Sequence, residues 1–248
     1  MPNSLTVELP AMPDRALSTQ GAQALSGGLP LRGITILAVE DSRFASEALR
    51  LMCQRLGARL RRAETIQAAR SHLRLYRPDV VIVDLGLPDG RGEALIREVV
   101  LRPNGPVVLG TSGDAAGRAL ALAAGAEGYV EKPLESLQAF ATALLRHLPD
   151  RALPAEAEGE ALVPDRLALR DDLARAADLI DAGLTREAGE YLAGFLSGVA
   201  AHAHDQDLAA ALRDGTAPDD RLARLRPLLD KRLSAAPQPF APSAAKPA

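Results

Sequence analysis

Six polar residues stand at or just after the ends of four short apolar runs, and their types could together bind a metal ion and a phosphate. In chain order they are Glu40, Asp41, Asp84, Thr111, Ser112 and Lys132. The carboxyl ends of the strands in an open parallel α/β sheet border one crevice, where ligands bind. Three carboxylates, two hydroxyls and a lysine at one crevice therefore predict a site for a metal ion and a phosphoryl group.

The adjacent acids Glu40 and Asp41 carry the metal prediction. Two like charges held close together cost about 4 kcal/mol at an effective dielectric constant near 20. A divalent cation removes that cost, and Mg²⁺ prefers one or two carboxylates together with waters and a phosphate. The alternative is that the two acids only cap a helix that begins near Ser42. We favour the Mg²⁺ site because the other site positions stand at matching strand ends.

Lys132 also allows two interpretations. It precedes Pro133, so it could be an ordinary surface lysine before a turn. It also follows a strand at the place where a phosphoryl group on Asp84 would need a positive counter-charge.

The apolar pattern that positions these residues alternates between short β-branched runs and longer helical runs. The expected strands are 34–39, 59–63, 78–84, 107–110 and 128–131, and the expected helices are 43–56, 64–76, 91–101, 115–124 and 134–148. A strand and helix repeated five times predict an α/β fold with a doubly wound, five-stranded parallel sheet. The run 59–63 is basic, which suits an edge strand.

The chain divides into five expected segments. They are a flexible N-terminal leader (1–32), an α/β domain (33–149), a linker (150–164), a helical module (165–234) and a disordered tail (235–248). The helical module shows four runs of apolar residues at helical spacing. Pro227 lies inside the fourth run, and we expect it to kink or split that helix.

Composition excludes several classes of protein. The formal net charge is −3, which gives no general attraction to nucleic acid or to an anionic membrane. The single cysteine, Cys53, lies in an apolar helical run, so we expect inert core packing. The sequence has no long apolar run and its start lacks the layout of a signal peptide. We therefore expect a soluble, cytoplasmic protein.

The ordered motifs strongly resemble the receiver domain of bacterial two-component response regulators, of the chemotaxis-regulator type. The matching elements are Glu40-Asp41, Asp84 with Leu87-Pro88 and Gly90, Thr111-Ser112, Gly125 to Tyr129, and Lys132-Pro133. The resemblance covers residues 33–149 and implies a flavodoxin-like domain that accepts a phosphoryl group. The implied donor is a histidine kinase or a histidine phosphotransfer protein. It implies no enzymatic activity beyond Mg²⁺-dependent phosphorylation and dephosphorylation of the protein itself.

The resemblance also implies a role for each site residue. Asp84 is the phosphoacceptor and a metal ligand, Asp41 binds Mg²⁺ directly, Glu40 positions a metal-bound water, and the backbone carbonyl of Gly86 supplies a further ligand. Lys132 pairs with the phosphoryl oxygens, Thr111 moves to bond them, and Tyr129 changes rotamer with Thr111. Gly86 and Gly113 lack the side chains that many relatives carry there, which leaves the lifetime of the phosphorylated state open.

The helical module carries no motif that identifies its output. We expect it to bind a downstream protein or to form a self-dimer, and we expect neither DNA nor a membrane as partner. The alternative is a DNA-binding transcriptional regulator, supported only by the basic stretch from Arg221 to Arg232. His202 and His204 are expected at a helix end or exposed, and Gly194 and Gly198 within internal packing.

Overall fold

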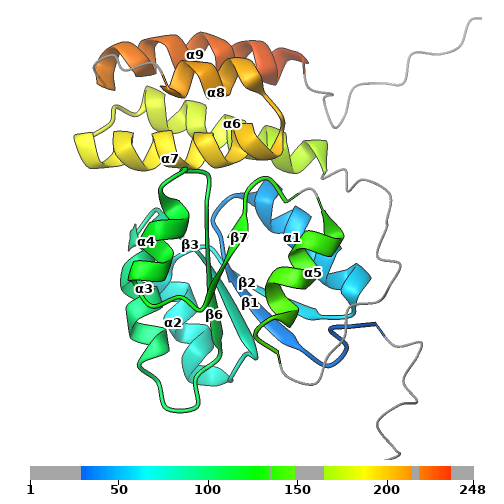
Figure 1. Cartoon of the computed structure of the whole chain (residues 1–248). Helices are drawn as coiled ribbons and strands as arrows, with labels where there is room; N and C mark the ends of the chain where they lie inside the picture. The colour runs from blue at the N-terminus through cyan, green and yellow to red at the C-terminus, as the bar shows by residue number, and fades with distance from the viewer. Residues whose placement is uncertain (1–28, 135, 149–164, 214–217, 236–248) are drawn as a thin grey trace, which may run out of the picture.

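The computed structural model describes residues 29–134, 136–148, 165–213 and 218–235 (Figure 1). Most of the expected leader, the expected linker and nearly all of the expected tail lie outside these ranges. Leu31, which we had assigned to the leader, is fully buried in the α/β core, so the packed part of the domain begins before residue 33. Among the described residues, no helix has the length and apolar character needed to cross a membrane.

A five-stranded parallel sheet forms the centre of the α/β domain, in the order β2-β1-β3-β6-β7. The strands are β1 (Thr35–Val39), β2 (Arg59–Ala63), β3 (Val80–Asp84), β6 (Val107–Ser112) and β7 (Gly128–Glu131). The predicted doubly wound fold is confirmed, and the basic strand β2 lies at an edge as expected. A short antiparallel hairpin of β4 (Gly86–Leu87) and β5 (Gly90–Arg91) was not predicted, because two-residue strands leave no periodic signal.

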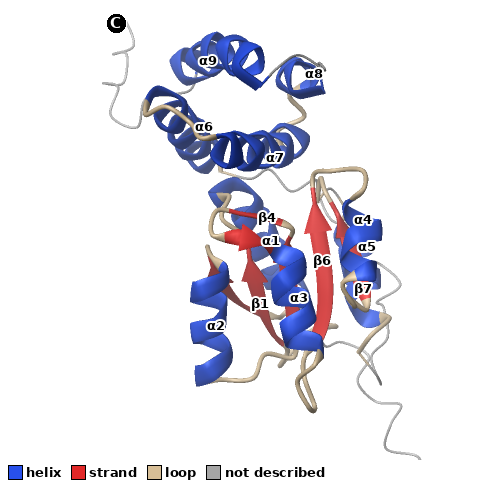
Figure 2. Cartoon of the chain, turned by 90° about the vertical axis from the view of Figure 1, so that its left-hand side faces the viewer, coloured by secondary structure: helices blue, strands red, loops and turns tan. Residues whose placement is uncertain are grey.

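Helices cover both faces of this sheet (Figures 1 and 2). They are α1 (Arg43–Leu56), α2 (Ile66–Leu75), α3 (Gly92–Val100), α4 (Gly117–Ala123) and α5 (Leu137–Leu145). Side chains of β1 alternate between two apolar clusters: Ile36 packs with α1 and α5 residues, and Leu37 packs with residues of α2, α3 and α4. This alternation of period two buries the strand on both faces. Cys53 belongs to the first cluster and is buried, as expected.

The helices begin where local sequence chemistry predicts. The side chains of Ser42, Thr65 and Ser136 accept hydrogen bonds from backbone N–H groups three residues further on, at the starts of α1, α2 and α5. Such caps satisfy N–H groups that have no partner within the helix. Because Ser42 caps α1 itself, the neighbouring acids Glu40 and Asp41 are left for another role.

The helical module consists of α6 (Arg166–Asp181), α7 (Arg186–His202), α8 (Gln206–Arg213) and α9 (Pro218–Ala235). Its own apolar core includes Leu173, Leu192, Phe195, Leu208 and Leu229. Helix α9 continues through Pro227 as one helix, so the expected split does not occur. Its packing against α6 and the pairing of Arg226 with Asp181 of α6 support the helix across the proline.

The helical module lies across the end of the sheet where the strands terminate. Figure 1 shows α6 and α7 directly above the strand ends, with α8 and α9 on their far side. Helix α6 packs against α1, and α7 packs against both α1 and β4. The predicted crevice is therefore the surface on which the helical module rests.

Candidate functional site

Three buried carboxylates meet at the strand ends, as the sequence predicts. Glu40, Asp41 and Asp84 are 1%, 3% and 8% exposed, and one oxygen atom from each lies within 4.8 Å of the others. Asp84 ends β3, and the two other acids follow β1, its neighbour in the sheet. The parallel register of two adjacent strands thus brings together residues 43 positions apart in the chain.

Lys132 supplies the positive charge at this acidic cluster. Its Nζ lies 2.8 Å from Glu40 Oε2 and 2.5 Å from Asp84 Oδ2, and its side chain is 3% exposed. Burial alone would lower the pKa of Lys132, but the charges of Asp84 and Glu40 outweigh burial and raise the pKa. Burial raises the pKa of Glu40, and the charge of Lys132 opposes that rise. The interpretation of Lys132 as an ordinary surface lysine is wrong.

The remaining predicted site residues surround Asp84. Thr111 pairs with Asp84 in the sheet register, and its Oγ1 is buried with no hydrogen-bond partner among the described residues. The Gly86 N–H donates to Asp84 Oδ1 at 3.1 Å. A buried hydroxyl without a partner beside the Asp84 carboxylate is suited to bind an oxygen atom of an incoming group.

Tyr129 lies on the other side of Thr111, in β7. Its ring is 7% exposed, and its hydroxyl donates to the Ser112 carbonyl at 3.1 Å. Burial raises the pKa of Tyr129 to about 12, so the phenol stays protonated at neutral pH. Tyr129 is therefore a buried, neutral phenol that contacts the backbone beside Thr111.

The donor set fits Mg²⁺. Three carboxylates with oxygen atoms within 4.8 Å of one another offer the hard ligands that this ion prefers. Asp41 and Asp84 would bind the ion, Glu40 would orient a water on it, and the Gly86 carbonyl would complete the protein ligands.

Asp172 of the helical module binds the first turn of α1. Its carboxylate accepts hydrogen bonds from the Ser42 hydroxyl at 2.7 Å and from the backbone N–H groups of Arg43 and Phe44 at 3.0 Å each. These are N–H groups that the helix itself cannot satisfy. Burial raises the pKa of Asp172, and the three hydrogen bonds oppose that rise. A residue about 130 positions away thus completes the cap of α1.

Two further side chains of the helical module bind the predicted metal ligand Asp41. The Tyr191 hydroxyl donates to Asp41 Oδ2, and Arg175 Nη1 lies 3.2 Å from the same oxygen. Arg175 Nη2 also donates to the Tyr191 hydroxyl at 2.9 Å. Burial raises the pKa of Asp41 to about 6, while Tyr191 and Arg175 oppose the rise. Both donors therefore favour the charged carboxylate.

Helix α7 approaches the backbone of the loop after β6 closely. A Cβ atom added to Gly113 would lie 2.8 Å from the backbone nitrogen of Gly198, closer than real Cβ contacts. Ser197 of the same helix donates to the Gly113 carbonyl at 3.4 Å. Gly198 therefore packs against the α/β domain, whereas no atom lies within 4 Å of a Cβ built on Gly194. Only one of the two glycines meets the expectation of internal packing.

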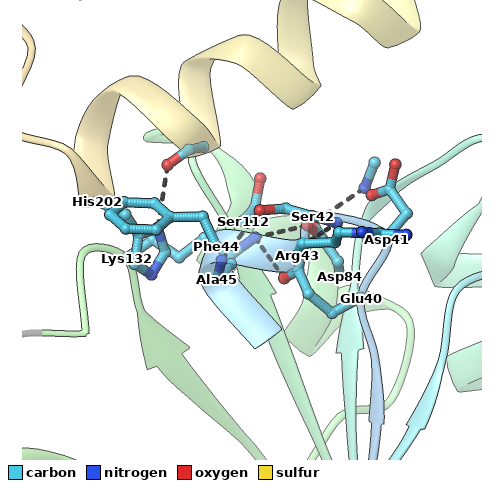
Figure 3. Close-up of polar contacts among 12 residues, drawn as sticks. Glu40, Asp41, Ser42, Arg43, Phe44, Ala45, Asp84, Ser112, Lys132 and His202 are labelled. Atoms are coloured by element: carbon cyan, nitrogen blue, oxygen red, sulfur yellow. Dashed lines mark hydrogen bonds and ion pairs between the residues drawn. The ribbon is translucent and has the colours of Figure 1, made fainter. Parts of the chain in front are cut away.

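His202, the last residue of α7, is buried beside Lys132 and Phe44 (Figure 3). It is 6% exposed, and its Nδ1 lies 3.0 Å from the Gly198 carbonyl. Burial lowers the pKa of His202 to about 4, and the charge of Lys132 adds to this effect. His202 lies at a helix end, as expected, and His204 is exposed; burial of His202 against the site was not expected.

Three site residues were missed by reasoning from the sequence: Asp172, Arg175 and Tyr191. Each lies on a helix whose apolar pattern predicts only internal packing. The available signal was weak: Asp172 is adjacent in sequence to Leu173 and four residues before Ala176, and both of these apolar residues are buried. A carboxylate on an apolar helix face needs a hydrogen-bonding partner, and that partner was not identifiable from local spacing.

Comparisons with known proteins agree with this geometry. Residues 36–143 match the response regulator receiver domain. The KDP operon transcriptional regulatory protein KdpE of Escherichia coli K12 is 38% identical over 116 residues, which is 45% of this chain and 52% of that protein. The transcriptional regulatory protein PhoP of Escherichia coli K12 is 36% identical over 117 residues, with the same coverage. The chain thus spans about half the length of the curated relatives it matches.

Solved structures give matches of similar extent. The response regulator receiver domain from Methylobacillus flagellatus is 25% identical, with a TM-score of 0.38, and the match covers 40% of this chain and 86% of that chain. The sheet order and the site geometry agree with the match of residues 36–143 to the response regulator receiver domain. The helical module lies beyond the matched residues 36–143.

Proposed function

We propose that this protein is a two-component response regulator that accepts a phosphoryl group on Asp84 and signals through its helical module. The observation that carries the proposal is the contact of Lys132 with both Asp84 and Glu40 inside a buried acidic cluster. A lysine and three carboxylates, gathered from the ends of β1, β3 and β7, match the charge pattern that phosphoryl transfer requires.

The proposed reaction uses few groups. An Asp84 oxygen attacks the phosphorus of a phosphohistidine, the P–O bond forms, and the P–N bond breaks with its electron pair left on the imidazole nitrogen. Lys132 neutralises the phosphoryl oxygens, and Thr111 donates its hydroxyl to one of them. Bound Mg²⁺ would neutralise charge that develops on the transferring group. The donor would be a histidine kinase or a histidine phosphotransfer protein, in the cytoplasm.

Acetyl phosphate with Mg²⁺ tests the acceptor assignment without the natural donor. The full chain should gain one base-labile phosphoryl group, and Asp84→Asn should gain none. Asp89→Asn is the matched control, because Asp89 follows the same strand but caps α2 by accepting from the Ile66 and Gln67 N–H groups. Undiminished labelling of Asp84→Asn, measured by intact mass, would show that the acceptor is another residue.

The output of the helical module has two candidate classes. The main proposal is binding to a downstream protein or to a second copy of the chain. The second candidate is DNA binding, which the names of the relatives KdpE and PhoP favour. In the basic stretch, however, Arg226 pairs with Asp181 and Asp230, and Arg232 pairs with Asp205 and Asp207. Those paired arginines are less available for phosphate contacts.

A gel-shift assay at physiological salt separates the two candidates. DNA binding should fall steeply with added salt if phosphate contacts drive it. Binding that is retained only by phosphorylated protein would favour the transcriptional regulator. A shift in oligomer size or a protein partner, with no DNA binding, would favour the main proposal. The chemotaxis type of receiver stays a prediction, because these curated relatives carry the names of transcriptional regulators.

A further inference from the structure

We infer that Arg175 and Tyr191 form a latch that holds the helical module closed over the receiver site by competing with Mg²⁺ for Asp41. The inference rests on the proposed function, because it treats Asp41 as a metal ligand and Asp84 as the phosphoacceptor. It assigns to the helical module a regulatory contact with the site itself, in addition to any downstream output.

The competition follows from the atoms involved. Tyr191 and Arg175 both bind the same oxygen, Asp41 Oδ2. That carboxylate is needed as a ligand by a divalent cation, and a guanidinium group beside it repels the cation. Arg175 is therefore a tethered positive charge that takes the place of the metal charge at Asp41. Either the latch or the cation can neutralise this carboxylate, and each weakens the binding of the other.

The latch has a route by which a small ion can reach it. A cavity of about 540 Å³ opens between α6 and the receiver beside Asp41. Its lining includes Asp41, Glu64, Asp171, Asp172 and Asp178, with Arg43 and Arg175. Carboxylates along a cavity attract cations. Mg²⁺ can therefore approach Asp41 while the helical module is still docked.

A protein donor has no such route in the closed arrangement. Asp84 is 8% exposed and the Lys132 side chain is 3% exposed, and a Cβ atom built on Gly198 of α7 would lie 3.7 Å from Lys132 Nζ. A phosphohistidine on another protein must reach Asp84 from the side that α7 covers. Release of the latch by Mg²⁺ thus precedes transfer from a protein donor, and docking of the helical module opposes it.

Calorimetric titration of Mg²⁺ into the full chain tests the latch directly. The variant Arg175→Gln with Tyr191→Phe removes both competing contacts and keeps similar side-chain volumes. It should bind Mg²⁺ about tenfold more tightly than the wild type, because the two contacts that compete with the ion for the Asp41 carboxylate are gone. Arg186→Gln is the matched control: it lies on the same helix as Tyr191, removes a positive charge as Arg175→Gln does, and breaks only the exposed Arg186–Glu190 contact without touching Asp41. The control should bind Mg²⁺ as the wild type does.

Hydrogen exchange gives a second readout that does not depend on phosphorylation. Saturating Mg²⁺ should raise exchange in α6 and α7 of the wild type. Equal Mg²⁺ affinity in the double variant and the wild type, or Mg²⁺ binding with no change in exchange there, would overturn the latch. Labelling of Asp84 by acetyl phosphate separates the two proposals. If Asp84 is labelled but the double variant binds Mg²⁺ no more tightly than the wild type, the latch is wrong and the phosphoacceptor role stands. If the double variant binds Mg²⁺ tenfold more tightly but Asp84 is not labelled, the phosphoacceptor role is wrong and the latch stands.

Discussion

The receiver core and the surface between the receiver and the helical module differ in the type of side chain that they bury. The two core clusters consist of aliphatic and aromatic side chains packed on the sheet. The surface between the two parts instead contains polar groups, including the buried Asp172 and His202 and the half-buried Tyr191. An apolar core loses its favourable free energy whenever it is opened to water. A polar surface can open at lower cost if its groups find other partners.

The alternative partners are part of the proposed chemistry. Asp41 can exchange the latch for a cation, and Lys132 can exchange Glu40 and Asp84 for a phosphoryl group. A buried charge that loses its partner and gains no other strongly destabilises the protein. We therefore expect the apolar receiver core to stay folded throughout, and the polar contact between the receiver and the helical module to open when ligands bind.

The largest expected effect comes from a cavity-forming substitution in the core of the helical module, compared with one in the receiver core. Leu192→Ala, in the core of the helical module, should lower the free energy of unfolding by about 3 kcal/mol. It should also speed labelling by acetyl phosphate, because loosened α7 uncovers Asp84. Leu144→Ala is the control: Leu144 is equally buried but lies in the receiver core. Urea unfolding, followed by circular dichroism, measures the free energy of unfolding, and intact mass measures the rate of labelling. Equal labelling rates in Leu192→Ala and the wild type would contradict the covering role of α7.

The second prediction concerns pH and His202. Its pKa is lowered from the usual 6.5 to about 4, so between these values the unfolded chain binds a proton that the folded protein does not. Stability should therefore rise as pH rises from about 4 to about 6.5, by up to about 3 kcal/mol from this residue. Besides burial, Lys132 and His204 lower the pKa of His202, while Asp84 and the Gly198 carbonyl raise it.

Asp41 has the opposite effect to His202 on how stability depends on pH. Its pKa is raised to about 6, so its contribution to stability falls as pH rises between about 4 and 6. The difference in unfolding free energy between wild type and His202→Gln isolates His202. That difference should grow with pH across the window and become constant above about 6.5. A difference that does not change with pH would mean that His202 is not buried in its neutral form in solution.

The local parts of this structure could be predicted from the sequence. The runs that form β1 and β3 are β-branched and end in acids, so the acidic cluster follows from strand register alone. The contacts of the helical module could not be predicted in the same way. Arg175 and Tyr191 lie 134 and 150 residues from Asp41, and nothing in their helical spacing indicates a partner outside their own module.

Gly113 has a structural role in addition to the one expected from the sequence. Its missing side chain was interpreted through its effect on water near the phosphoryl group. The structure adds a steric reason, because the backbone of α7 occupies the space of a Cβ atom at this position. Such a close approach depends on the docking of the two parts, which sequence periodicity does not describe.

The third prediction uses this close approach. Gly113→Ala should displace α7 and weaken docking by about 2 kcal/mol, since the added Cβ would lie 2.8 Å from a backbone nitrogen. Labelling by acetyl phosphate and hydrogen exchange in α7 should both increase. Gly194→Ala on the same helix has open space at its Cβ and should stabilise the helix slightly without changing labelling. Identical exchange in α7 of Gly113→Ala and wild type would show that the helix is not docked there.

The smallest expected effect tests whether α1 is capped from outside the receiver. Asp172→Asn keeps one oxygen acceptor for the three donors at Ser42, Arg43 and Phe44, so at least one buried N–H or hydroxyl group loses its partner. We expect a loss of about 1 kcal/mol in unfolding free energy. Asp171→Asn, which removes only the exposed contact with Arg43, should cost less than about 0.5 kcal/mol.

Hydrogen exchange then shows which helix is destabilised in Asp172→Asn. If Asp172 caps α1 in solution, exchange should increase at the amide groups of Arg43 and Phe44 as well as in α6, because both sides of the contact lose a partner. Equal stability of the two variants, with unchanged exchange at the start of α1, would contradict the cap. A change confined to α6 would mean that Asp172 stabilises only its own helix, and α1 would then depend on Ser42 alone for its first turn.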